Sequence, residues 1–187
     1  MKKGNWLVLS LCVAVLVAGE AAQAQIALYG EATADYLNSG PYTDFLEGGT
    51  AGVLVDLGKG WHNRITLSAD LQGNFVYDNS QPDPASAFYT KGEMYDAITI
   101  GPRLSLTPHF FKLSPYVQGN LGFARYHDPN TRSTTDTAFG GEAGATRRLT
   151  PRFDAVVDYS YSYFGFNSGF YHPQTFSLGA IYHFAKR

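Results

Sequence analysis

Residues 64–77, RITLSADLQGNFVY, alternate polar and apolar side chains almost without interruption. Ile65, Leu67 and Leu71 belong to the apolar set, whereas Arg64 and Asp70 belong to the polar set. A β-strand directs successive side chains to opposite faces, so this segment predicts a strand with one apolar and one polar face. A soluble sandwich would bury the apolar face, whereas an outer-membrane barrel would turn it toward lipid. The rest of the sequence has to decide between these two arrangements.

Eight segments of this kind can be read along the chain, and the connections between them alternate in length. The predicted strands are residues 26–36, 50–57, 64–77, 95–106, 114–126, 137–147, 154–164 and 175–184. The short connections are 58–63, 107–111 and 148–152, and the long ones are 37–49, 78–93, 127–136 and 165–174. An even number of strands, with short turns alternating with long loops, is typical of outer-membrane barrels. The pattern predicts an all-β fold, an eight-stranded antiparallel up-and-down transmembrane β-barrel.

The polar faces carry charges of both signs and almost no lysine. Solvent-facing strand surfaces usually use lysine to protect their edges, so this composition favours side chains that face one another across a narrow lumen. The predicted barrel-interior charge network is Glu31, Asp56, Arg64, Asp70, Arg103, Glu142 and Asp158. Because acids outnumber bases in this set, some acid must be protonated, hydrated or bound to a cation. The apolar faces end in aromatic residues expected at the membrane interfaces, namely Tyr36, Tyr77, Phe153 and Tyr163.

The first 24 residues read as a cleaved signal peptide. Lys2 and Lys3 precede an apolar run at residues 6–18, and a small-x-small site follows at residues 22–24. The run is short for a membrane-spanning helix, which needs about 20 apolar residues. We therefore expect the barrel domain at residues 25–187. Cys12 is the single cysteine, and its removal with the signal excludes disulfides and cysteine metal sites from the exported chain.

The C-terminal segment SLGAIYHF adds a resemblance to a known family. Ser177, Gly179, Tyr182 and Phe184 match the C-terminal assembly signal of outer-membrane β-barrels. The stretches IGPRLSL and SPYVQGNLGFA are similar to middle strands of the small outer-membrane β-barrel domain family, with the OmpA/OmpX-type barrels closest in shape. The resemblance implies the outer membrane of a Gram-negative cell envelope, outer-membrane lipids including lipopolysaccharide as partners, and delivery by periplasmic chaperones and the barrel-assembly machinery. It also implies a monomer.

Function is less constrained than fold. An eight-stranded barrel has an interior just wide enough for its own side chains, which favours a non-enzymatic barrel with a structural or surface-interaction role. The alternative is a small channel or transporter for ions or small hydrophobic molecules, and a lipid-modifying enzyme comes third. Lipid A deacylases of the family use a His-x-Ser pair, and none of the five histidines is followed by serine two positions later.

Binding sites other than the lumen receive little support from the sequence. His127, Asp128, Asp136 and His172 lie on the long connections without the tight spacing of a metal site. We therefore predict no catalytic residue, no metal site and no cofactor. The net charge of −2 gives no reason to expect a nucleic-acid partner.

The two ends of the predicted barrel differ in charge. Lys59, Lys112, Arg148, Arg152, Lys186 and Arg187 fall on the short-turn side, whereas acids dominate the long connections. A basic rim at the inner leaflet can contact anionic phospholipid headgroups, or its charges can simply be solvated. The sequence leaves both interpretations open.

Overall fold

The computed structural model describes residues 25–39, 42–62, 64–77, 94–107, 113–127, 133–166 and 169–185. The predicted signal peptide lies outside these residues, so its assignment stays a prediction. Among the described residues, no helix is long and apolar enough to cross a membrane.

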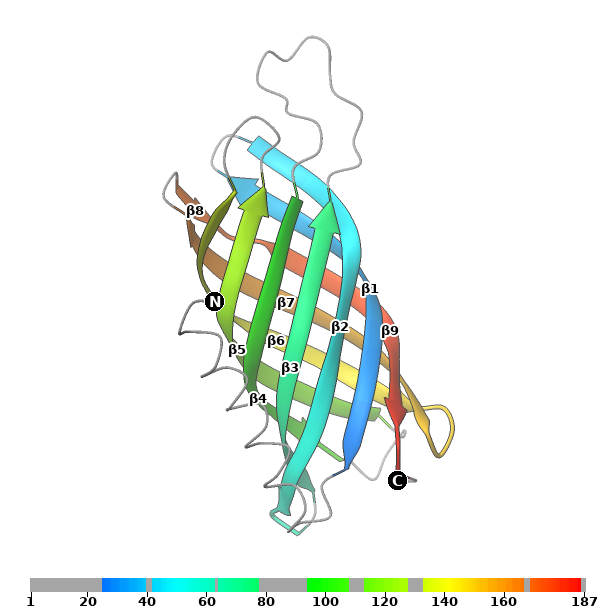
Figure 1. Cartoon of the computed structure of the whole chain (residues 1–187). Coiled ribbons are helices and arrows are strands. Elements are labelled where there is room, and N and C mark those ends of the chain that lie inside the picture. Colours follow the sequence, from blue (N-terminus) through cyan, green and yellow to red (C-terminus); the bar gives the residue numbers. More distant parts are fainter. Residues whose placement is uncertain are drawn as a thin grey trace, which may run out of the picture.

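Nine strands make up the described chain (Figure 1). They are β1 (Ile26–Ser39), β2 (Tyr42–Gly60), β3 (Ile65–Tyr77), β4 (Met94–Leu106), β5 (Leu113–His127), β6 (Thr134–Arg148), β7 (Phe153–Phe166), β8 (Gly169–Tyr171) and β9 (Gln174–His183). Each of β1 to β7 pairs antiparallel with the next strand along the chain. The pairing of β9 with both β7 and β1 closes the sheet into a barrel.

The wall of the barrel has eight positions because β8 and β9 share one of them. The outer end of β7 pairs with β8 through Phe164↔Tyr171, and its remainder pairs with β9 from Tyr161↔Gln174 onward. Closure pairs β1 to β7 and β9 with a neighbouring strand on each side, which is what a sheet needs in lipid. The predicted eight-stranded antiparallel barrel is confirmed.

The connection between the first two strands is a correction to the sequence prediction. We expected a long loop at residues 37–49, but the β1–β2 ladder runs as far as the pair Ser39↔Tyr42. An antiparallel hairpin satisfies its backbone N–H and C=O groups by itself, so pairing can continue where the alternation of side chains has faded.

Burial decides which face of each strand points inward. Asp70 and Arg103 are 0% and 3% exposed, whereas Ile98 and Phe123 are 64% and 62% exposed. An exposed band of large apolar side chains around a buried polar interior is the arrangement of a membrane barrel. The apolar face of the alternating segments therefore faces lipid, as expected for a transmembrane β-barrel.

The predicted interface aromatics all lie on the outward face. Tyr36, Tyr77 and Phe153 are exposed. Phe153 contacts Tyr182, with ring centroids 5.0 Å apart, at the end that carries the short turns. Tyr163 contacts Phe139 at 4.7 Å. Their placement at the membrane interfaces remains a prediction.

A polar network across the barrel lumen

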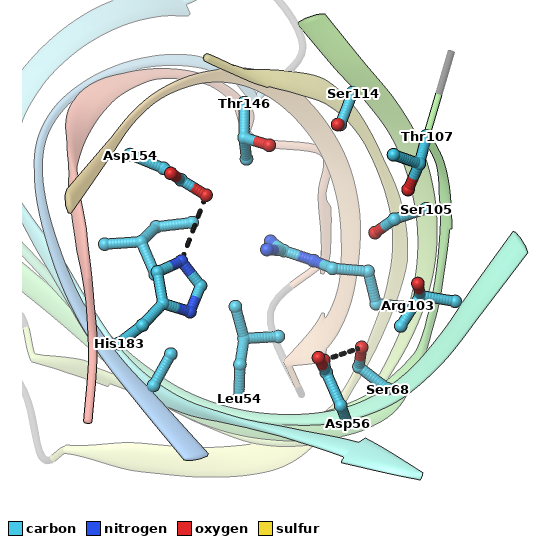
Figure 2. Close-up of a pocket in the computed structure, with 13 residues that line it drawn as sticks. Leu54, Asp56, Ser68, Arg103, Ser105, Thr107, Ser114, Thr146, Asp154 and His183 are labelled. Atoms are coloured by element: carbon cyan, nitrogen blue, oxygen red, sulfur yellow. Dashed lines mark hydrogen bonds and ion pairs between the residues drawn. The ribbon is translucent and has the colours of Figure 1, made fainter. Parts of the chain in front are cut away.

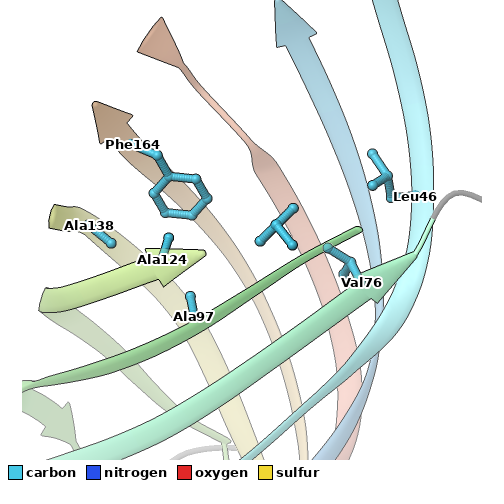
Figure 3. Packing of buried hydrophobic residues seen from close by; sticks show 7 residues of the cluster. Leu46, Val76, Ala97, Ala124, Ala138 and Phe164 are labelled. Atoms are coloured by element: carbon cyan, nitrogen blue, oxygen red, sulfur yellow. The ribbon is translucent and has the colours of Figure 1, made fainter. Parts of the chain in front are cut away.

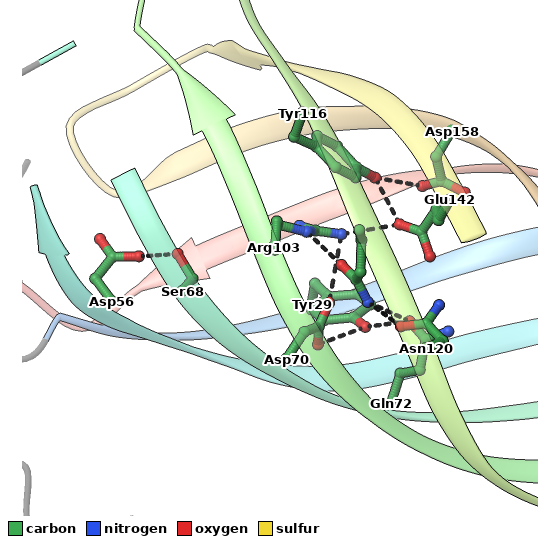
Figure 4. Close-up of polar contacts among 11 residues, drawn as sticks. Tyr29, Asp56, Ser68, Asp70, Gln72, Arg103, Tyr116, Asn120, Glu142 and Asp158 are labelled. Carbon is green, nitrogen blue, oxygen red and sulfur yellow. Dashed lines mark hydrogen bonds and ion pairs between the residues drawn. The ribbon is translucent and has the colours of Figure 1, made fainter. Parts of the chain in front are cut away.

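Arg103 on β4 is the centre of the polar contacts inside the barrel (Figure 4). Its Nε donates to Gln118 Oε1 at 2.7 Å, and its Nη2 donates to Glu142 Oε1 at 3.0 Å. Nη2 also lies 3.4 Å from Asp70 Oδ2. The strand register explains part of this set, because Arg103 lies opposite Gln118, which lies opposite Glu142. The guanidinium therefore connects β4 with β3, β5 and β6.

Two tyrosines enclose the guanidinium. The Tyr116 ring centroid is 3.8 Å from Arg103 Cζ, and the Tyr29 ring centroid is 5.8 Å away. The Tyr116 hydroxyl lies 2.9 Å from Glu142 Oε1 and 3.0 Å from Asp158 Oδ2, which brings β7 into the network. A buried cation over an aromatic face is stabilised by the ring quadrupole as well as by its carboxylate partners.

Amide side chains extend these contacts along the lumen. The Tyr29 hydroxyl lies 3.0 Å from Asp70 Oδ1 and 3.1 Å from Gln72 Oε1. Gln118 Nε2 donates to Asn120 Oδ1 at 2.7 Å and is 3.4 Å from Gln72 Oε1. We call the nine connected residues the lumen network: Tyr29, Asp70, Gln72, Arg103, Tyr116, Gln118, Asn120, Glu142 and Asp158. They come from six of the eight wall positions.

The structure brings five of the seven predicted interior charges together and places Asp56 and Arg64 elsewhere. Asp70, Arg103, Glu142 and Asp158 belong to the lumen network. Asp56 is further toward the short turns, where it accepts a hydrogen bond from Ser68 at 2.8 Å. Glu31 is half-buried on β1 opposite Gly179, and it borders the lumen network through a side-chain hydrogen bond with Asp158.

The inward placement predicted for Arg64 is wrong, because the Arg64 side chain is exposed in the turn between β2 and β3. Arg64 and Asp70 are an even number of positions apart, so the alternation puts both on the inward face, but β3 begins only at Ile65. Beyond the end of a strand, the alternation no longer directs a side chain into the lumen. The alternation along the sequence therefore identified the correct face only for residues that are inside a strand.

The sequence prediction missed the neutral members of the lumen network, which are Tyr29, Gln72, Tyr116, Gln118 and Asn120. All five lie on the predicted polar faces, so their inward direction was readable from the alternation. Selecting by charge alone left them out, although phenol and amide groups supply most of the partners of the buried charges. A search for every polar side chain on the inward face of the predicted strands would have found them.

A small cavity opens beside the network on the short-turn side (Figure 2). Its volume is about 40 Å³, and Arg103, Asp56, Asp154 and His183 are among its lining residues. His183 Nε2 is 3.0 Å from Asp154 Oδ2, and Arg148 Nε is 4.0 Å from Asp154 Oδ1. A cavity of this size holds about three water molecules.

The other side of the lumen network is closed by apolar side chains (Figure 3). Tyr95 and Phe164 make an edge-on ring contact at 5.3 Å. We call the full cluster the apolar layer: Leu46, Val76, Tyr95, Ala97, Ala124, Ala138 and Phe164. A second cavity of about 30 Å³, lined by residues of both the lumen network and the apolar layer, lies between them.

The C-terminal assembly signal lies on and just after β9. Ser177 is buried in the lumen, and Gly179 faces Glu31 on β1. A Cβ at Gly179 would come within 2.5 Å of Glu31 Cγ, so this position requires glycine for packing. Tyr182 and Phe184 form a ring contact at 5.3 Å. Recognition of these residues during assembly remains a prediction.

The loop residues considered for metal binding have other neighbours. His127 Nδ1 is 2.7 Å from Ser133 Oγ, and His172 Nδ1 is 3.1 Å from the Tyr161 hydroxyl. Asp128 lies outside the described residues. In the described part of the chain, no group of three or more histidine, cysteine or acidic residues has the geometry of a metal site.

Comparisons with known proteins agree with this architecture. The family model described as "Outer membrane protein beta-barrel domain" matches residues 7–184. No curated protein sequence matches the chain. The crystal structure of Neisserial surface protein A is similar, with a TM-score of 0.64 and 14% identity over 84% of this chain and 96% of that one. The attachment invasion locus protein Ail of Yersinia pestis has a TM-score of 0.53 and 18% identity over 86% and 99%.

Proposed function

Since the chain belongs to the outer membrane protein beta-barrel domain family, we propose that it is a non-enzymatic barrel with a structural or surface-interaction role. The observation that carries the proposal is the lumen network, whose buried residues cross the interior from six wall positions. A lumen filled in this way leaves no wide path for solutes.

The two layers of the interior support this proposal together. The cavities on either side of the lumen network measure only about 40 Å³ and 30 Å³. The apolar layer then closes the end that carries the long connections. Filling by side chains is what a barrel of eight strands allows.

A surface role also agrees with the names of two structural neighbours. One is a Neisserial surface protein, and the other is an attachment invasion locus protein. Low sequence identity limits this likeness to the fold, because one scaffold serves many unrelated roles. We propose outer-membrane lipids, lipopolysaccharide included, as the surroundings of the outward face.

The absence of an enzymatic role is part of the proposal. The polar groups of the lumen serve as partners for one another, and the His183–Asp154 pair is neighboured by Arg148 as a third charged group. The 3.0 Å hydrogen bond between His183 and Asp154 accounts for the buried histidine and carboxylate. A catalytic role is not needed to account for them.

Planar-bilayer recording tests the proposal against the channel alternative. The wild-type barrel, refolded and inserted into a neutral bilayer, is expected to give no stable conductance above that of a bilayer without protein. Heat-modifiable migration on a gel shows that the inserted protein is folded. A reproducible conductance from folded wild-type protein would overturn the closed-lumen proposal and favour a channel.

A further inference from the structure

The short-turn end of the barrel exposes charges of one sign. The exposed charged residues described there are all basic: Lys59, Arg64, Arg147, Arg148 and Arg152. The two acids of the same strand ends point inward, where Asp56 accepts a hydrogen bond from Ser68 and Asp154 pairs with His183. We call the five exposed residues the basic rim. Its positive charge is therefore not compensated by an exposed acid in the described residues.

The basic rim lies on two turns at opposite sides of the barrel. Lys59 and Arg64 flank the β2–β3 turn, whereas the three arginines flank or occupy the β6–β7 turn. The strands β3 to β6 separate these turns in one direction, and β7, β9, β1 and β2 separate them in the other. A single protein partner would cover one side, whereas a lipid leaflet surrounds the barrel and reaches both.

Each turn also projects an apolar side chain beside its basic residues. Trp61 is 69% exposed and Leu149 is 62% exposed. Trp61 and His62 have φ angles of 42° and 57°, a left-handed conformation that costs free energy in residues with a Cβ. A strained turn that presents an exposed tryptophan is consistent with a binding role for the tip.

The β6–β7 turn is held by its own backbone. The N–H groups of Leu149 and Thr150 donate to the Phe153 carbonyl at 2.9 and 3.0 Å. The Thr150 hydroxyl oxygen accepts from the N–H groups of Arg152 and Phe153 at 3.3 and 3.0 Å. The turn's backbone is internally satisfied, so it does not compete for the arginine side chains. Arg148 Nε lies 4.0 Å from Asp154 Oδ1 and Arg152 Nη1 lies 3.4 Å from the Tyr182 hydroxyl. Each guanidinium carries five N–H donors, so these single contacts leave donors that can reach an external anion.

We propose that the basic rim binds the phosphate groups of anionic glycerophospholipids in the leaflet next to the short turns. Guanidinium groups match phosphate geometry, and tryptophan belongs at the headgroup level. Lysine and arginine near an anionic lipid surface each contribute roughly a five-fold gain in affinity at low ionic strength. This inference goes beyond the proposed function, because it holds whether or not the lumen conducts.

Trp61 provides a local reporter for the first turn. The barrel domain of residues 25–187 has Trp61 as its single tryptophan. This protein is reconstituted in phosphatidylcholine vesicles containing a minority of phosphatidylglycerol, with bromine on the acyl chains of either one lipid or the other. We expect brominated phosphatidylglycerol to quench Trp61 more than its share of the bilayer predicts. Added salt should reduce this excess.

Variants that replace basic residues of the rim with glutamine test whether the rim causes the preference for phosphatidylglycerol. Lys59→Gln with Arg64→Gln should lower the phosphatidylglycerol preference at Trp61 several-fold. The matched control is Arg125→Gln, since Arg125 is an exposed cation of β5 at the other end of the barrel. This control should leave the preference unchanged. Heat-modifiable migration shows that each variant is folded.

The second turn is tested in the same way with its own reporter. Trp61→Phe with Leu149→Trp moves the single tryptophan of the barrel domain to the β6–β7 turn. Arg147→Gln with Arg152→Gln should then lower the preference there. Equal quenching by the two brominated lipids at both turns would mean that the rim is only solvated, which overturns the proposal. A preference confined to one turn would also overturn the proposal that the whole rim binds anionic phospholipid.

Discussion

The lumen network and the apolar layer occupy neighbouring levels of the same barrel, and both consist of inward-facing strand residues. The lumen network is held by directional contacts, such as the 2.7 Å hydrogen bond from Arg103 to Gln118. The apolar layer is held by packing around Phe164 and Val76. Removing a polar partner leaves a buried charge unpaired, whereas removing an apolar group leaves a cavity. The two layers should therefore respond differently to substitutions of similar size.

Replacing Arg103 should have the largest effect. Arg103→Met leaves Asp70 and Glu142 without their cation, and breaking a buried ion pair costs about 3–5 kcal/mol. We expect a lower midpoint in a urea titration of the refolded barrel, with a conductance appearing in planar bilayers.

A compensated variant sharpens this test. Adding Asp70→Asn and Glu142→Gln to Arg103→Met should recover part of the lost stability, because no carboxylate is then left unpaired. If Arg103→Met alone were as stable as the wild type, the lumen network would not stabilise the barrel, and the contrast between the layers would fail.

An apolar substitution of the opposite layer should cost less and leave the lumen closed. Leu46 is fully buried, and Leu46→Ala is expected to lower the free energy of unfolding by about 2–3 kcal/mol. The same urea titration measures the loss. Because the lumen network below is intact, bilayer recordings should remain at background. A conductance of Leu46→Ala equal to that of Arg103→Met would show that the apolar layer is the true barrier.

A pair of matched tyrosine substitutions compares the two layers directly. Tyr116→Phe removes a hydroxyl that contacts Glu142 and Asp158 but keeps the ring beside Arg103. Leaving buried acceptors without this partner should cost about 1–2 kcal/mol. Tyr95→Phe keeps the ring contact with Phe164 and should change stability by less than about 0.5 kcal/mol. Equal losses in denaturant titrations would contradict the assignment of Tyr95 to packing.

A substitution outside the lumen should also have a small effect. Arg125 Nη2 lies 2.9 Å from Asp96 Oδ1, but the arginine side chain is 54% exposed. An exposed ion pair contributes about 0–1 kcal/mol, so Arg125→Met should scarcely move the urea midpoint. A loss as large as that of Arg103→Met would mean that burial does not determine the strength of these pairs.

The alternation of residues 64–77 and its seven counterparts predicted the wall of the barrel, the direction of each face and the inward position of Arg103. Predictions failed at strand ends and in one long connection, because residues 165–174 were expected to form a loop but contain β8. Arg64 has inward parity but precedes β3, and residues 37–49 continue the β1–β2 ladder. The alternation of polar and apolar residues indicates the face on which a residue lies inside a strand. It carries little information about where backbone pairing begins and ends.

By itself, the sequence determined the faces, because a strand has a repeat of two residues that no neighbouring strand can change. The tertiary structure decided the register, which aligns Arg103 with Gln118 and Gln118 with Glu142. Sliding one strand by two residues keeps every face in place but separates these partners by a full repeat. The turns of the hairpins and the closure of the barrel together fix that stagger, because β9 must meet β1 and β7 at the same time.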